Sequence, residues 1–160
     1  MVLVKDLITL RGRMTATMVN IYTGKRKVYV KNNLIMKAGL NAIIRRLVDN
    51  QYYSNEGMIT YIGVGDGTST PVNTQTTLDN EIARVQRSYG TDYNTTTMKC
   101  RAFFTSAEAN FTITEAACFG EEATSSVDTG TMFNRVNGLS IAKTSAYTLT
   151  IQFEWVFDNA

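Results

Sequence analysis

The stretch YTLTIQFEWVF, residues 147–157, decides the fold class of this chain. Its large apolar side chains recur at every second position, and polar side chains lie between them. The apolar set is Tyr147, Leu149, Ile151, Phe153, Trp155 and Phe157, and the polar set is Thr148, Thr150, Gln152 and Glu154. Because successive side chains of a β-strand point to opposite faces, this alternation predicts a strand with one face in a hydrophobic core.

A second β signal lies near the start of the chain. Residues 12–33 predict a hairpin, because two runs of β-forming residues flank the turn Thr23-Gly24-Lys25. In the second run Val28 and Val30 share one face, and Lys27, Tyr29 and Lys31 occupy the other. This arrangement is typical of a sheet with one face in solvent.

The period of the apolar residues changes once, between residues 36 and 49. There they fall at helical spacing, which predicts one amphipathic helix whose apolar stripe packs on the sheet. The stripe consists of Leu40, Ile43, Ile44, Leu47 and Val48.

The other segments are assigned by turn residues and alternation. We expect strands at 58–64, 109–119 and 131–136, a hairpin from 84–93 and 97–105, a helical turn at 78–84, and loops at 65–77 and 121–130. The chain is therefore mainly β, and we expect an antiparallel β-sandwich, jelly-roll-like or immunoglobulin-like, with one amphipathic helix packed on it. The sandwich should be a single domain over residues 12–160.

Residues 1–11 differ from the rest because their apolar residues lack a clean period. The large aliphatic residues are Val2, Leu3, Val4, Leu7, Ile8 and Leu10. Such a segment suits either an edge strand or an arm that pairs with a neighbouring subunit, since one domain of this size cannot easily bury both of its faces.

Composition excludes several classes of function. The 160 residues include no histidine, so neither a Ser-His-Asp nor a Cys-His catalytic arrangement can be built within one chain. The formal net charge of +2 disfavours direct binding of nucleic acid. No apolar run is long enough to span a membrane, and the N-terminus lacks the pattern of a signal peptide. Cys100 and Cys118 lack the spacing of a zinc site, and we expect both thiols to be free.

The sequence Gly63-Val64-Gly65-Asp66-Gly67 invites comparison with phosphate-binding loops. A P-loop requires lysine followed by serine or threonine after its last glycine, and here Thr68 follows Gly67. The spacing of a dinucleotide-binding loop also fails. We therefore expect backbone turns here and no cofactor.

Four charged residues are candidates for buried ion pairs. Glu81 and Arg84 have the spacing of a helical pair, which would fix the 65–77 loop on the sheet. Glu115 lies on an apolar strand face and needs a cationic partner, for which Arg84 and Arg135 are the candidates. No pattern links the carboxylates as an acid and base pair, so we expect no catalytic residues, no metal and no enzyme activity.

The order of several short motifs resembles a group of tailed-bacteriophage virion proteins. The motifs are Asn33-Leu34-Ile35 through Gly39, the strand end Tyr61 to Thr68, Pro71, Thr77 to Arg84, Glu108-Ala109-Asn110, Ile113 to Ala116, and Phe133-Asn134-Arg135. The resemblance spans roughly residues 33–157. It implies a structural subunit of a phage virion, assembled in the host bacterial cytoplasm, whose partners are other copies of itself in a trimer or ring and other virion proteins.

The resemblance leaves the position in the particle open. A tail, baseplate, collar or fibre-attachment component is the first expectation, and a capsid decoration protein that stabilises the head is the second. A small carbohydrate-binding module for receptor recognition is a further alternative, for which the candidate aromatic residues are Tyr52, Tyr53, Tyr89 and Tyr93.

Overall fold

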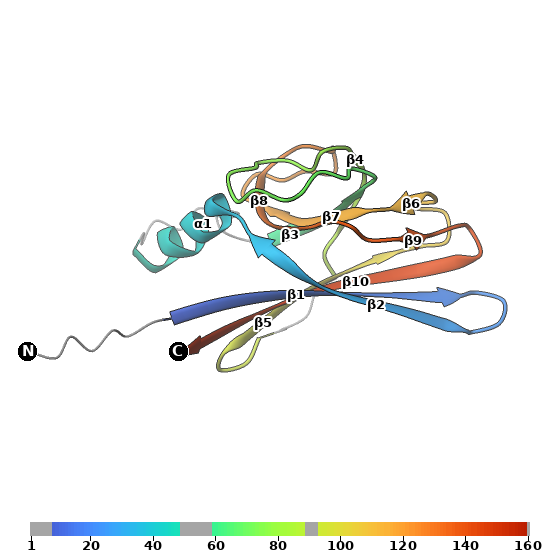
Figure 1. Cartoon of the computed structure of the whole chain (residues 1–160), viewed down its shortest axis with the longest axis horizontal. Coiled ribbons are helices and arrows are strands. Elements are labelled where there is room, and N and C mark those ends of the chain that lie inside the picture. The colour runs from blue at the N-terminus through green and yellow to red at the C-terminus, as the bar shows by residue number, and fades with distance from the viewer. Residues whose placement is uncertain (1–7, 49–58, 89–92, 160) are drawn as a thin grey trace, which may run out of the picture.

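The computed structural model describes residues 8–48, 59–88 and 93–159, and these residues form a mainly β fold with one short helix (Figure 1). The elements are β1 (Ile8–Asn20), β2 (Arg26–Ile35), α1 (Lys37–Val48), β3 (Ile59–Gly65), β4 (Glu81–Gln86), β5 (Thr97–Phe104), β6 (Thr112–Ile113), β7 (Glu115–Gly120), β8 (Thr131–Val136), β9 (Ile141–Ala142) and β10 (Tyr147–Asn159).

Eight of these strands form one antiparallel sheet in the order β4-β3-β7-β8-β2-β1-β10-β5, and β6 pairs with β9 separately. The sheet folds over on itself, so that β1, β10, β5 and most of β2 form one layer and β3, β7 and β8 form another (Figure 1). The two outermost strands, β4 and β5, approach each other. The Ser88 N–H, beyond the end of β4, donates to the Arg101 carbonyl of β5 at 2.7 Å. The sheet is therefore nearly closed.

The strand that decided the prediction, β10, lies inside the first layer. It pairs with β1 along one side and with β5 along the other. Leu149, Ile151 and Phe153 are fully buried, as the alternation predicts. Their face meets the second layer, and the core cluster joins residues of both, including Met14, Met18, Phe104, Ile62 and Cys118.

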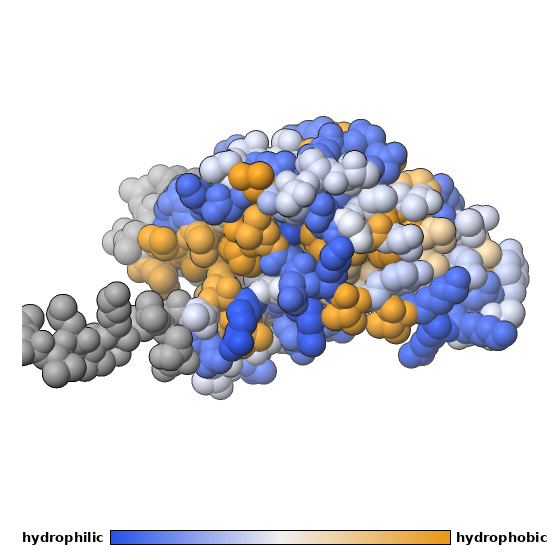
Figure 2. Space-filling model, viewed as in Figure 1, coloured by the Kyte–Doolittle hydropathy of each residue, from blue (hydrophilic) through white to orange (hydrophobic). Residues whose placement is uncertain are grey.

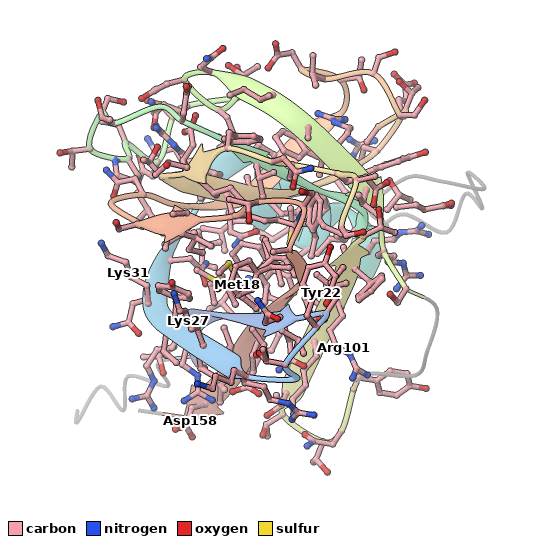
Figure 3. The ribbon with its side chains drawn as sticks, turned by 90° about the vertical axis from the view of Figure 1, so that its right-hand side faces the viewer. Met18, Tyr22, Lys27, Lys31, Arg101 and Asp158 are labelled. Carbon is pink, nitrogen blue, oxygen red and sulfur yellow. The ribbon has the colours of Figure 1, made fainter. Side chains whose placement is uncertain are left out.

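The predicted hairpin is confirmed as β1 and β2. Gly24 takes a positive φ of 68° in the turn, and the Asn20 side chain accepts hydrogen bonds from the next turn residues. Met18 points between the two layers, whereas Lys31 lies on the outside (Figure 3). Val28 and Val30 face solvent, with 60% and 59% of their surface exposed.

Strand β2 belongs to both layers. Arg26 to Asn33 pair with β1, and Leu34 and Ile35 pair with β8. No other strand among the described residues pairs with β2, so its edge beside β8 is joined at those two positions.

The predicted helix is confirmed as α1, but the prediction that its apolar stripe packs on the sheet is wrong. Leu40, Ile44 and Leu47 are 40%, 57% and 80% exposed. The buried side of α1 carries small residues instead: Gly39 lies so close to the Phe133 backbone that a Cβ would overlap it, and Ala42 is buried. Close approach through small residues turns the larger side chains away from β8.

Three further predictions need correction. Residues 78–84 form no helical turn, because bends lead from Leu78 into β4. The expected hairpin of 84–93 with 97–105 forms only in part: β4 pairs with β3 and β5 pairs with β10. Near the turn at Asn94, Tyr93 pairs with Met98, and the Ser88 N–H donates to the Arg101 carbonyl. The single strand expected at 109–119 is divided into β6 and β7 at Thr114.

Candidate functional site

The carboxylate of Glu115, at the start of β7, is fully buried, accepts four hydrogen bonds and forms an ion pair with Arg135. Main-chain N–H groups of Gly67, Asp79 and Asn80 donate to it at 3.1, 3.2 and 2.9 Å. Arg135 of β8 donates the fourth hydrogen bond from Nε at 3.0 Å, and its Nη2 lies 2.8 Å from the carboxylate in the ion pair. Glu115 therefore holds both ends of the loop between β3 and β4.

The Arg135 guanidinium is also fully buried and holds the middle of the same loop. Its Nη2 lies 2.8 Å from Oδ2 of Asp79, and its Nη1 donates to Oε1 of Gln75 at 2.7 Å. Ser69 contributes longer contacts of 3.4 Å. Hydrogen bonds from Ser69 and the charge of Arg135 lower the pKa of Asp79 below its ordinary value of 3.8, although partial burial opposes the shift.

A second buried pair joins Glu81 and Arg84 within β4. Arg84 binds both carboxylate oxygens, with Nε at 2.7 Å and Nη2 at 2.6 Å, and neither side chain is exposed. The Asp128 N–H donates to Glu81 at 2.9 Å, and Arg84 donates to the carbonyls of Thr124 and Thr129. This pair therefore holds the loop between β7 and β8.

A β-bulge lets Glu81 and Arg84 meet although they lie on a strand. Side chains three positions apart on a regular strand point to opposite faces. Here the register shifts between Val64 and Gly65, so β4 has one extra residue, Ile82, and Glu81 and Arg84 reach the same face. The Arg84 guanidinium then lies 4.5 Å from the centre of the Phe119 ring, a cation–π contact.

The glycines of the 63–67 stretch make room for these two carboxylates. A Cβ at Gly63 would overlap the Glu81 carboxylate, and a Cβ at Gly65 or Gly67 would overlap or crowd that of Glu115. The three glycines share one face of the chain, so their missing side chains leave the space that the acids fill. This packing accounts for the motif that resembled a phosphate-binding loop.

The structure confirms the Glu81–Arg84 pair and selects one of the two candidate partners of Glu115, but the loop that the first pair fixes differs from the expectation. Arg135, and not Arg84, binds Glu115, and the Glu81–Arg84 pair fixes the 121–130 loop in place of the 65–77 loop. Val2, Leu3, Val4 and Leu7 lie outside the described residues. Ile8 and Leu10 belong to β1 and pair with Asn159 and Phe157 of β10.

Sequence reasoning missed Lys143, a buried cation beside β9. Its Nζ donates to the Glu108 carbonyl and to the Asn110 side chain. These hydrogen bonds fix the turn between the two residues, in which Ala109 has a φ of 52°. Burial lowers the pKa of Lys143, and the nearby Glu108 charge opposes that shift. The residue falls outside any alternating run, so no pattern marks it as buried.

Cys100 of β5 and Cys118 of β7 are free, as predicted, and both are buried. Burial, and next the neighbouring Cys100 thiol, raises the pKa of Cys118 well above 9.0. The Cys118 side chain therefore remains a protonated thiol at neutral pH.

The arrangement of these groups is suited to holding the chain rather than to proton transfer. Each carboxylate of the two pairs is neutralised by an arginine and engaged by main-chain donors. Within residues 8–48, 59–88 and 93–159, no group of three or more acidic, cysteine or histidine side chains could hold a metal ion. The described part of the chain also contains no helix that is long and apolar enough to cross a membrane.

No protein-family model, no curated protein and no solved structure matches this chain.

Proposed function

We propose that this chain is a non-enzymatic structural subunit of a tailed-bacteriophage virion, in first place a tail, baseplate, collar or fibre-attachment component. The observation that carries the structural role is the use of the buried ionic groups. The hydrogen bonds of two buried ion pairs, Glu115–Arg135 and Glu81–Arg84, fix two long loops. The virion assignment itself rests on the order of sequence motifs.

The surface of the first layer supports an assembling role. A row of paired residues crosses its outer face from Val28 through Thr17 and Thr150 to Phe103. Val28 and Phe103, at the two ends of this row, are 60% and 47% exposed. Exposed apolar patches on a sheet commonly become buried against another protein. We include in the proposal that the folded-over sheet is a β-sandwich of jelly-roll-like or immunoglobulin-like type.

The position in the particle is the part of the proposal that an experiment can decide directly. Phage particles that carry this protein would be separated into heads and tails and analysed by mass spectrometry. Presence in the tail fraction supports the first assignment, and presence on heads identifies a decoration protein. Absence from both fractions, or glycan, peptide or nucleotide turnover that one carboxylate substitution abolishes, contradicts the proposal.

Among the tyrosines considered for carbohydrate binding, Tyr93 is described, and it is 73% exposed. Tyr52, Tyr53 and Tyr89 lie outside the described residues. A glycan array with the purified protein tests this alternative, and retention of a glycan that Tyr93→Ala abolishes would favour it over the structural role.

A further inference from the structure

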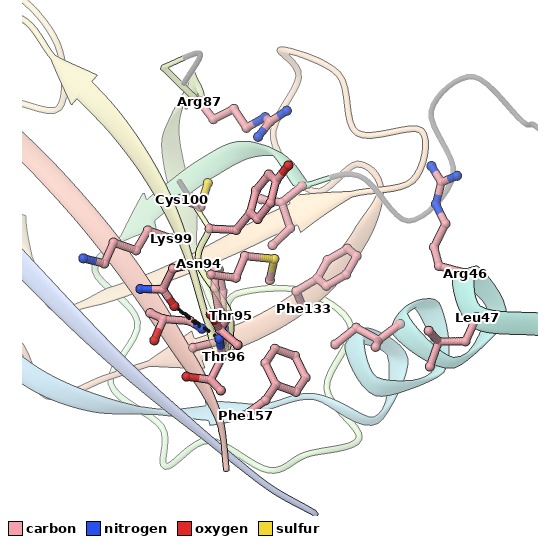
Figure 4. Close-up of a pocket in the computed structure, with 16 residues that line it drawn as sticks. Arg46, Leu47, Arg87, Asn94, Thr95, Thr96, Lys99, Cys100, Phe133 and Phe157 are labelled. Carbon is pink, nitrogen blue, oxygen red and sulfur yellow. Dashed lines mark hydrogen bonds between the residues drawn. The ribbon is translucent and has the colours of Figure 1, made fainter. Parts of the chain in front are cut away.

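An apolar groove of about 610 Å³ opens between α1 and the end of the sheet (Figure 4). Its apolar lining comes from five elements: Ile43 and Leu47 of α1, Ile59 of β3, Met98 of β5, Phe133 of β8, and Trp155 and Phe157 of β10. Its charged lining residues are Arg46, Arg87 and Lys99, so the groove carries basic groups and no acidic ones among the described residues.

The helix wall of this groove is open to solvent. Leu47 is 80% exposed, and Leu40 and Ile44 on the same helix are 40% and 57% exposed. Figure 2 shows apolar side chains gathered at this end of the molecule. A single exposed aliphatic residue is ordinary, but three exposed aliphatic residues on one short helix beside an apolar groove mark a surface for burial.

The N-terminal residues begin beside the groove. Leu10 of β1 pairs with Phe157, which lines the groove, and Ile8 pairs with Asn159 two positions farther along. Residues 1–7 precede this point and include Val2, Leu3, Val4 and Leu7. Seven residues reach at most about 25 Å from Ile8, enough to cross a groove of this size.

The direction of β1 favours a neighbour's groove over the chain's own. Ile8 ends the strand still paired with β10, so the chain arrives along the sheet direction. Entering its own groove would require a reversal directly before Ile8. Residues 2–7 contain no glycine, proline or asparagine, and Asp6 is the single residue there that favours turns. A second copy can receive the segment without that reversal.

We propose that residues 2–7 of one copy bind in the groove between α1 and the β5–β10 edge of a second copy. Burial of the four aliphatic side chains against Leu47, Phe157 and their neighbours drives the association. The inference rests on the proposed function in that it specifies how copies of the structural subunit meet. Exchange between two copies fills both grooves at once, as a two-fold dimer requires.

The first test is the oligomeric state of the full-length protein, measured by analytical ultracentrifugation over a range of concentrations. We expect a dimer or larger oligomer that becomes monomeric when residues 2–7 are deleted, a deletion that leaves β1 intact. Leu47→Glu should give the same result, because it places a charge in the groove. The matched control is Val72→Glu, since Val72 is 55% exposed and lies outside the groove. A monomeric full-length protein, or deletion without effect on the oligomer, overturns the inference.

The second test separates a neighbour's groove from the chain's own. A chain with Leu3→Cys is mixed with a chain carrying Leu47→Cys and treated with a short bismaleimide. The native thiols are buried and do not compete. We expect a cross-linked dimer that joins one chain of each kind. A chain that carries both substitutions is treated in parallel. Cross-linking within that chain, with no cross-link between the two single variants, overturns the inference.

Virion incorporation is read separately from self-association. Arm-dependent oligomers of a protein that is absent from particles would contradict the proposed function and leave the inference standing. Entry into particles together with oligomers that the deletion does not change would contradict the inference and leave the proposed function standing.

Discussion

The Nη2 atom of Arg135 lies 2.8 Å from Oε2 of Glu115, and both side chains are completely buried. The two residues come from adjacent strands, β8 and β7, with Arg135 opposite Ala117 in the register. A buried charge without a counter-charge is costly, so each residue makes the burial of the other tolerable. The pair also fixes the β3–β4 loop, because Glu115 accepts hydrogen bonds from both ends of it.

Replacing Arg135 with methionine should destabilise the protein by about 3–5 kcal/mol, because it leaves the Glu115 carboxylate buried without its cation. Urea denaturation followed by circular dichroism measures this change. The control is Arg11→Met, since Arg11 pairs with Asp158 at the surface, where a salt bridge contributes about 1 kcal/mol or less. Equal losses of unfolding free energy in the two variants would show that the buried pair contributes no more than the surface pair.

Replacing Arg84 with alanine should cost about 3 kcal/mol and loosen the 121–130 loop, because Arg84 and Glu81 hold that loop through its backbone. Hydrogen exchange should rise at the Asp128 amide, which donates to Glu81. Amides of residues 66–80 should change less, since Glu115 and Arg135 still hold them. Faster exchange confined to residues 66–80 would contradict this division of roles.

Substituting Gly67 with alanine should destabilise the fold by about 1–3 kcal/mol, because the added Cβ would overlap the side chains of Asp79 and Glu115. Gly24→Asn is the control: Gly24 has open space around it, and asparagine tolerates its positive φ. Thermal unfolding compares the two. A Gly67 variant as stable as the Gly24 variant would mean that the loop backbone moves to admit a side chain.

Both cysteines should resist alkylation in the native protein and react fully in denaturant without reductant. Cys100 and Cys118 are buried, and the raised pKa of Cys118 keeps it as the unreactive thiol. Mass spectrometry after iodoacetamide treatment counts the labelled thiols. Failure of both to react in denaturant would show that they are joined in a disulfide.

Asp79 should make stability fall at acid pH. Its folded-state pKa lies below 3.8, so its contribution is complete at neutral pH and is lost as the pH falls through the folded-state pKa. Asp79→Asn should therefore flatten the dependence of unfolding free energy on pH between about pH 5 and pH 2. The wild-type protein measured in the same buffers is the reference, and identical curves would rule Asp79 out.

Patterns with a simple period predicted the fold well. The alternation in residues 147–157 located β10 and its buried face, and the turn around Gly24 located the first hairpin. The β class follows from such local signals, because the alternation of apolar and polar residues indicates both a strand and the face that it buries.

Contacts distant in sequence were less predictable. The i,i+3 spacing of Glu81 and Arg84 indicates a helical turn, and the same spacing arises on a strand once a bulge adds Ile82. Nothing near Glu115 in the sequence distinguishes Arg84 from Arg135 as its partner, because that choice depends on which strands are neighbours.

The helix illustrates a third kind of limit. Its stripe of Leu40, Ile44 and Leu47 has the period of a buried face, yet Gly39 and Ala42 face the sheet. A hydrophobic period identifies a face that favours burial, but it does not say whether the same chain or another molecule covers it.

The way β2 passes between the two layers gives the molecule a directional mechanical response. All 13 residues of β1 pair with β10, so a pull along β1 strains that long ladder in shear, with its hydrogen bonds acting together. The junction of β2 with β8 rests on Leu34 and Ile35, and a force that separates the layers there breaks those pairs one after the other. Tension applied through the N-terminal end of β1 is therefore resisted by the stiffest part of the sheet.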